Sequence, residues 1–379
     1  MKTIHNYDSE ILGSRLKQAR MDAQITQDLA AQEIGVARTT IVAIEKGQRK
    51  LKDNEFVRLC SFYKVAASSI LRPSQKREDL IFKFRRDSKV QADSPEAQRA
   101  IELLLSLASA SEELESMMGR SRHKPQLIQH VIQDRDIKTQ AEDAASALRQ
   151  MIGIGSSPVE DLFSLLEFHL GFSIFVRELD SNISGLYVNN VQIGNCMLLN
   201  AKHAIGRLHF TAAHELGHAV SSVSAYHVNF DGHDESSKEE MFANSFASSF
   251  LMPASFIRKV FDEYRSQGSF SPRQLIVMAK TSNISPEALC RRLEGLGLLR
   301  QGTYDSIKER GFSPSELDNQ IGREESSGVH LVPERICLLM ADAYSDGLLS
   351  EGQLAKKFSL DRVEVRELLD AMQVKKPAK

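Results

Sequence analysis

Two histidines four residues apart, with a glutamate directly after the first, are the feature of this chain that most constrains its fold. They are His214 and His218, with Glu215 in the order His-Glu-x-x-His. Side chains at positions i and i+4 share a face in an α-helix, so the pair predicts a helix at this point. Two imidazoles on one helical face can bind a single Zn²⁺ ion, and Glu215 then lies beside that ion as a general base toward water. The motif therefore predicts a zinc site with hydrolytic chemistry.

A third zinc ligand is expected from a second helical segment downstream. Glu240, Ala243 and Ala247 fall on one face at helical spacing. The two alanines allow close approach to the first helix, which brings the Glu240 carboxylate to the metal. Two histidines, one carboxylate and a water form the open arrangement of catalytic zinc sites. Mn²⁺ or Fe²⁺ can also occupy such sites, and the adjacent Glu239 is the alternative third ligand.

Other polar residues lie near this motif in the sequence. Tyr226 and His227 follow the predicted helix and are candidates for donating a hydrogen bond to the transition state. A loop is expected at 231–234, where His233 is an alternative ligand or donor. His209 precedes the motif by five residues, off the ligand face, and is expected to be structural.

The first 77 residues carry an excess of positive charge. They contain 14 Lys and Arg against 8 Asp and Glu, a balance of +6, so the remainder must carry −8 to reach the total of −2. Apolar residues recur at helical spacing through 10–71, which predicts four or five short helices. Thr26 is expected to cap the start of the second helix, and Gly35 to end it. A small, basic, helical unit indicates contact with nucleic acid.

Within this unit the spacing predicts a helix-turn-helix. Leu29 and Ala30 are expected to face inward, and the tight turn at Gly35 leads into a reading helix. The start of that helix can enter a major groove, where arginine reads guanine and threonine contacts base edges. The flanking polar and basic residues are expected at phosphates. The predicted DNA-binding residues are Gln27, Ala37, Arg38, Thr39, Thr40, Lys46 and Arg49.

A C-terminal segment repeats this pattern in weaker form. The stretch from Leu354 to Arg362 echoes the stretch from Leu29 to Arg38 and is one residue shorter. Its expected reading helix carries acidic residues such as Glu364, which phosphates would repel. The pattern favours a structural or protein-contact role for this block over DNA binding.

Two families resemble parts of the chain. Residues 11–71 resemble the Xre/Cro and phage-repressor class of helix-turn-helix domains, in the order Thr-Gln, Leu-Ala, Gly-Val, Arg-Thr-Thr-Ile and Glu-x-Gly-x-Arg. Residues 141–299 are similar to the ImmA/IrrE metallopeptidase family, above all in 207–219 and 240–253. This second resemblance implies zinc ligands at His214, His218 and Glu240, with Glu215 catalytic. It also implies cleavage of helix-turn-helix repressors, and a role in mobile elements or stress responses.

These features predict a DNA-binding transcriptional regulator with a zinc-dependent peptidase that cleaves a helix-turn-helix repressor or its own chain. The polar stretches 72–93 and 120–134 are the expected self-cleavage sites. The alternative is a non-enzymatic Xre-type repressor whose second domain senses a ligand or protein, in a toxin–antitoxin or mobile-element system. Double-stranded operator DNA and a repressor substrate are the expected partners. A homodimer is expected because operators of this class are usually palindromic.

The expected fold is mainly α, in four parts. They are a five-helix DNA-binding domain (1–75), a helical linker (76–134), an α+β, zincin-like metallopeptidase domain with a small sheet (135–300), and a C-terminal, degenerate helix-turn-helix-like block (301–379). Strands are expected near 172–176, 185–191 and 196–199. No apolar run approaches the roughly 18–20 residues of a membrane span. The N-terminus has no apolar core, so a cytoplasmic protein without a membrane partner is expected.

Overall fold

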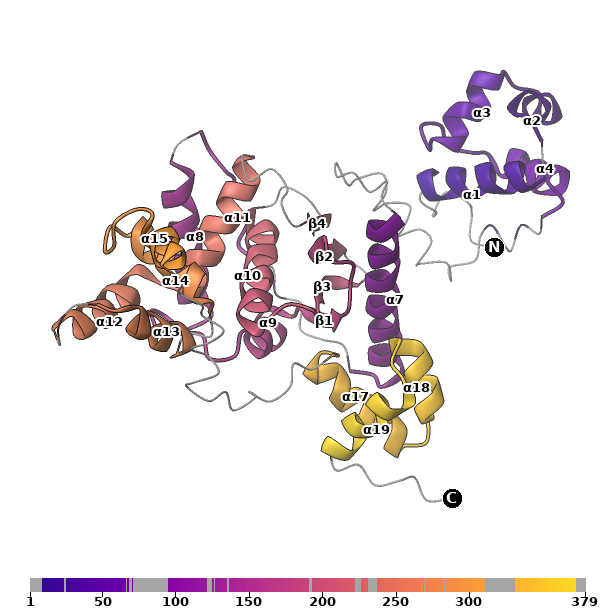
Figure 1. Ribbon diagram of the computed structural model, residues 1–379. Coiled ribbons are helices and arrows are strands. Elements are labelled where there is room, and N and C mark those ends of the chain that lie inside the picture. Colours follow the sequence, from indigo (N-terminus) through magenta and orange to yellow (C-terminus); the bar gives the residue numbers. More distant parts are fainter. Residues whose placement is uncertain are drawn as a thin grey trace. The chain divides into compact units, whose positions relative to one another are not determined.

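The chain divides into two compact units in the computed structural model, Met1–Arg86 and Asp87–Lys379 (Figure 1). The structure describes residues 9–65 except 24, then 95–120, 127–134, 136–190, 193–221, 226–230, 237–266, 270–281, 284–310 and 331–372, with 67, 70, 125 and 268 as single residues. Each unit is described by itself below.

The first unit is a small helical bundle. Its helices are α1 (Ser9–Asp22), α2 (Gln27–Ile34), α3 (Arg38–Glu45) and α4 (Asp53–Phe62). The Thr26 hydroxyl accepts a hydrogen bond from the Leu29 amide at 3.3 Å, and Gly35 adopts a left-handed conformation (φ 73°). Both signals at the ends of α2 are therefore confirmed. The expected fifth helix, near residue 70, lies mostly outside the described residues.

The inward face of α2 differs from the expected one. Leu29 was expected in the core, but it is 47% exposed, while Ala30 and Ala31 are buried together with Ile34. The buried face is thus shifted by one residue along the helix. Two alanines bring the backbone of α2 close to its neighbours, and a leucine in place of either would hold them apart.

The second unit consists of helices around one small sheet. Its helices are α7 (Pro95–Met117), α8 (Ile137–Met151), α9 (Leu162–Leu170), α10 (Ile205–Ser221), α11 (Lys238–Leu251), α12 (Ala254–Ser266), α13 (Pro272–Thr281), α14 (Pro286–Gly295), α15 (Thr303–Glu309), α17 (Glu334–Ser345), α18 (Glu351–Phe358) and α19 (Arg362–Ala371). The strands are β1 (Ser173–Arg177), β2 (Ile183–Asn190), β3 (Gly194–Asn200) and β4 (Tyr226–Phe230). A mainly α fold with a small central sheet is therefore confirmed. No helix among the described residues is long and apolar enough to cross a membrane.

The sheet has the strand order β1-β3-β2-β4. The β1–β3 pair is parallel, whereas β2 pairs antiparallel with both β3 and β4. Helix α10 covers one face and α7 covers the other (Figure 1). Alternate residues of β3 serve the two sides: Met197 and Leu199 join the core around α10, and Leu198 points the opposite way. Covering on both faces explains why β1 and β3 are buried along nearly their whole length.

Helix α7, expected within a linker, packs in this unit against the sheet and against α17 and α18. Eleven of its 23 residues are buried, so one side of the helix is in contact with the unit along its length. Ion pairs reinforce the packing: Glu115 pairs with Arg335, and Glu113 with Lys357 at 2.6 Å. The four-part division of the chain stays a prediction.

Helices α18 and α19 repeat the helix-turn-helix of the first unit without a gap. They begin 324 positions after α2 and α3, at 351 against 27 and at 362 against 38. The turn residue Ser359 is left-handed (φ 51°), as is Gly35 at the matching position. The expected one-residue difference in spacing is wrong. It came from pairing Leu354 with Leu29, whereas the buried Leu354 and Ala355 correspond to Ala30 and Ala31.

Candidate functional site

Three ligand atoms meet where the C-terminal half of α10 passes the first turn of α11. His214 Nε2 lies 3.0 Å from His218 Nε2 and 3.3 Å from Glu240 Oε2, and His218 Nε2 lies 3.4 Å from Glu240 Oε1. Both histidines are buried, and Glu240 is half-buried. The expected helical faces therefore bring these three side chains together.

The three residues fit a single metal ion. Two ligands bound tetrahedrally to Zn²⁺ at about 2.0–2.1 Å lie roughly 3.3 Å from each other, close to the separations observed. A half-buried third ligand leaves one side of the group open, as a catalytic site requires. Among the residues that the structure describes, this is the group of His, Cys, Asp and Glu side chains with metal-binding geometry. The described Glu239 does not belong to it.

Glu215 follows His214 in the sequence, and its side chain is fully buried. Its neighbour across the helix–sheet interface is Tyr187 of β2, which donates a hydrogen bond to Asn195 Oδ1 at 2.9 Å. Burial strongly raises the pKa of the Tyr187 hydroxyl, and the charge of Glu215 adds to the rise. The carboxylate thus lies inside the protein, next to the histidines that the motif predicts as ligands.

Asn244 orients one of the histidines. Its Oδ1 lies 2.9 Å from His214 Nδ1, so that nitrogen donates its hydrogen and leaves the Nε2 lone pair directed at the meeting point of the ligands. Such outer contacts set the tautomer of metal-binding histidines. Sequence analysis missed Asn244, although it stands four residues after Glu240 and so shares its helical face.

Close contact between the two helices depends on Gly217. A Cβ at this position would lie 2.9 Å from Ala243 Cα and 3.3 Å from Phe246 Cβ. The glycine inside the His-Glu-x-x-His motif therefore complements the alanine predicted on the opposite helix. Together they bring Glu240 within reach of the histidines.

The far end of α11 is fixed by two arginines from other helices. Arg149 of α8 is buried, donates to the Phe250 carbonyl and lies over the Phe250 ring. Burial lowers the pKa of Arg149 to about 10. Arg292 of α14 donates to the Met252 carbonyl at 3.1 Å and pairs with Glu142 of α8 at 2.8 Å. Positive charge at the C-terminal end of a helix is favourable, and these contacts hold α11 in its place beside α10.

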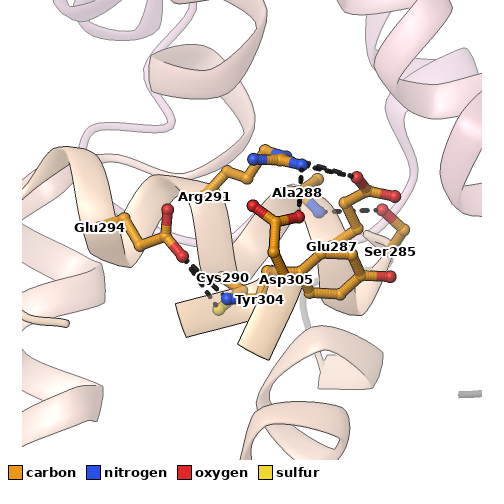
Figure 2. A network of polar contacts seen from close by, with 8 residues as sticks. All are labelled: Ser285, Glu287, Ala288, Cys290, Arg291, Glu294, Tyr304 and Asp305. Atoms are coloured by element: carbon orange, nitrogen blue, oxygen red, sulfur yellow. Dashed lines mark hydrogen bonds and ion pairs between the residues drawn. The ribbon is translucent and has the colours of Figure 1, made fainter. Parts of the chain in front are cut away.

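Helix α14 is in turn tied to α15 by a polar network (Figure 2). Arg291 pairs with Glu287 and Asp305 and lies over the ring of Tyr304, and the buried Glu294 accepts from the Tyr304 amide at 3.0 Å. The adjacent arginines 291 and 292 thus serve different neighbours, α15 and α11.

Four other residues near the motif were singled out from the sequence, and none of them belongs to the group of ligand atoms found among the described residues. Tyr226 and His227 begin β4, where their backbones pair with Val188 and Tyr187 of β2. Residues 231–234, and with them His233, lie outside the described residues. His209 is buried edge-on to the ring of Phe163, in agreement with the expected structural role.

The predicted DNA-binding residues cluster around the start of α3. Ala37 is its N-cap, and Arg38 and Thr39 are exposed with Thr40 beside them. Lys46 is exposed after the helix.

Two other predicted DNA-binding residues are engaged within the unit. Gln27 Nε2 donates to Glu45 at 2.9 Å, and Arg20 donates to the same buried carboxylate at 2.6 Å. Arg49 forms a two-point contact with Glu55, both bonds 2.9 Å long. Arg38 at the start of α3 has an ion pair with Asp28 that is longer, at 3.7 Å, and both of these side chains are exposed.

Two segments of the chain match known protein families. Residues 11–69 match the family model described as helix-turn-helix domain, and residues 169–294 match the one described as IrrE N-terminal-like domain. The second match spans the sheet, α10 and α11, and so contains the whole group of ligand atoms. No curated protein matches the chain. The chain thus joins an Xre-type helix-turn-helix domain to a peptidase-family domain of the ImmA/IrrE type.

Proposed function

We propose that this protein is a DNA-binding transcriptional regulator whose central domain is a zinc-dependent peptidase. The observation that carries the proposal is the convergence of His214, His218 and Glu240 beside the buried Glu215. Zinc held by these side chains would supply Lewis acidity toward a peptide carbonyl. Mn²⁺ or Fe²⁺ are the alternative metals for this ligand set.

The protein's own groups have distinct roles in the proposed reaction. Glu215 accepts the proton of the attacking water and returns it to the leaving amine. Asn244 keeps His214 in the tautomer that directs Nε2 at the metal. Tyr226 or His227 donates a hydrogen bond to the oxygen on which negative charge develops.

The proposed substrate is a helix-turn-helix repressor or the chain itself, and cleavage changes gene expression. Of the two expected self-cleavage stretches, 72–93 lies outside the described residues. Within 120–134, residues 127–134 are held by hydrogen bonds such as that from the His130 amide to the Val220 carbonyl at 2.8 Å. Cleavage within 127–134 would first require their release.

The proposed DNA contact is made by the start of α3. Arg38, Thr39 and Thr40 read bases, and Lys46 contacts a phosphate. Gln27, held by Glu45, contacts a phosphate or a base, and Arg49 contacts a phosphate on exchange of its bonds to Glu55. A homodimer on a palindromic operator is part of the proposal, because one helix-turn-helix reads one half-site.

The deciding experiment compares wild type, Glu215→Gln and Glu239→Gln for zinc content and for cleavage of co-expressed helix-turn-helix proteins and of the chain itself. We expect one zinc per chain in all three proteins, with cleavage lost only in Glu215→Gln. Zinc binding without cleavage by wild type would favour the alternative, a repressor that uses this domain as a sensor of a ligand or protein. Absence of bound metal in wild type would overturn the peptidase proposal.

A further inference from the structure

Residues 127–134 form an extended segment between α7 and α8 that we call the strap. It runs past the C-terminal end of α10, the helix that carries both histidines. The His130 amide donates to the Val220 carbonyl at 2.8 Å, and Gln129 Nε2 donates to the Ala219 carbonyl at 3.3 Å. The strap therefore supplies hydrogen bonds to the last turn of α10, whose carbonyls have no partner further along the helix.

The same segment contacts the first turn of α11. The ring of His130 stacks on Phe242, with centroids 5.3 Å apart and an angle of 19° between the planes. Asp134 forms an ion pair with Lys238, the first residue of α11. Lys238 and Phe242 stand two residues before and after Glu240, on a different face of the first turns of α11, and Val220 stands two residues after His218. One short segment thus touches both ligand-bearing helices within two residues of their ligands along the chain.

The side chain of Gln140, in α8, holds the strap through its backbone at Gln133. This side chain is 1% exposed. Its Nε2 donates to the Gln133 carbonyl at 3.1 Å, and its Oε1 accepts from the Gln133 amide at 2.9 Å. A buried side-chain amide that bonds both the N–H and the C=O of one residue acts like a neighbouring β-strand. It fixes the strap without apolar packing at that point, since Gln133 is itself exposed.

We infer that Gln140 is a positioning residue for the metal centre, acting through the strap. The strap holds the last turn of α10 against the first turn of α11, and so sets the separation of His218 and Glu240. Metal–ligand distances tolerate changes of only about 0.2 Å, so loosening this contact weakens metal binding while the helices stay folded. The inference rests on the metal site of the proposed function.

Gln140→Met tests the inference in the full-length chain. Methionine keeps the length of the side chain but loses the two hydrogen bonds to Gln133 and the longer contacts to the Asp136 carbonyl and His130 Nε2. Gln150→Met is the matched control, being an exposed glutamine on the same helix. Zinc affinity is measured by competition with a chelator. The visible absorption of the Co²⁺-loaded protein reports ligand geometry, and circular dichroism reports folding. We expect Gln140→Met to bind zinc about tenfold or more weakly, with an altered Co²⁺ spectrum, and Gln150→Met to match wild type.

His130→Ala is the second variant. It removes the stacking on Phe242 and the 3.5 Å contact of His130 Nε2 with Gln140 Oε1, but keeps the amide that donates to the Val220 carbonyl. We expect a smaller loss of zinc affinity in the same direction. Unchanged zinc affinity and Co²⁺ spectra in both folded variants would overturn the inference and leave the strap a purely structural element. Should Gln140→Met fail to fold, His130→Ala decides alone. If wild type itself binds no metal, the proposed function fails, which is a different result from equal binding by wild type and variants.

Discussion

The absence of a side chain at Gly217 determines how closely α11 can approach α10. A Cβ there would approach Ala243 Cα to 2.9 Å, so Gly217→Ala must push the two backbones apart. We expect zinc affinity to fall at least about tenfold, since displaced ligands cannot all reach one ion. Titration with a competing chelator measures the effect. Gly295→Ala is the control: its Cβ meets nothing within 4 Å, and we expect its zinc affinity to match that of wild type.

Glu167 of α9 is a buried carboxyl that binds the N-terminus of α17. It accepts hydrogen bonds from the Glu334 and Arg335 amides, both 2.9 Å long. Burial raises its pKa to about 7 despite these bonds. The folded protein therefore retains a proton that the unfolded chain loses near pH 4.5, and this contribution to stability is lost as the pH rises from about 4.5 through 7.

Glu167→Gln should remove that pH dependence while keeping an acceptor for the amides. We expect the unfolding free energy of wild type to decline relative to the variant between pH 4.5 and 7, by up to about 3 kcal/mol at about 1.4 kcal/mol per pKa unit. Urea unfolding at a series of pH values measures the difference. Parallel curves for the two proteins would show that Glu167 stays ionised in the folded state.

The two helix-turn-helix elements offer a matched test of DNA binding. Arg38 and Arg362 occupy the same position, first in their respective second helices. The α18–α19 element has Glu351 at the position that Gln27 occupies in α2. An acidic side chain at this position would repel a DNA phosphate. We expect Arg38→Ala to weaken binding to a duplex selected by wild type from a random pool, by about 1–3 kcal/mol, and Arg362→Ala to have no effect. Equal losses of DNA affinity in the two variants would assign DNA binding to both helix-turn-helix elements.

Elements whose signals are local could be predicted from the sequence. The spacing of His214, His218 and Glu240 requires only helical geometry, and the structure brings these residues together. Thr26 and Gly35 mark the ends of α2 by backbone chemistry alone. By contrast, β4 was not predicted, although Tyr226, Val228 and Phe230 alternate with polar residues over its five positions.

What depended on packing between distant segments was not predicted. The one-residue shift of the buried face of α2 is set by its neighbours, as is the burial of α7 against the sheet. Arg149 reaches a carbonyl 101 residues away, and no local signal marks such a contact. Sequence spacing thus identifies the ligands, whereas their supports come from the whole second unit.

At the scale of the whole molecule, two fragments test which part of the chain can fold on its own. Phe175, Leu186 and Leu198 are fully buried on the sheet face opposite α10. A fragment of residues 87–379 keeps α7 and α17–α19, and we expect it to fold cooperatively and to bind zinc as the full chain does. A fragment of 135–300 lacks these covers, and we expect it to aggregate or to unfold without cooperativity. Calorimetry and zinc titration distinguish the two, and equal behaviour would support the four-part division.

The two-sided covering of the sheet also limits how such a protein can be assembled by recombination. The segment that matches the IrrE N-terminal-like domain, 169–294, holds the ligands but neither α7 nor the C-terminal helices. A gene that acquired only this segment would encode a sheet with one bare apolar face. The segment that must be inherited as one piece is therefore longer than the recognisable motif. It does not include the first unit, Met1–Arg86. Its transfer between regulators requires both flanks to travel with the centre.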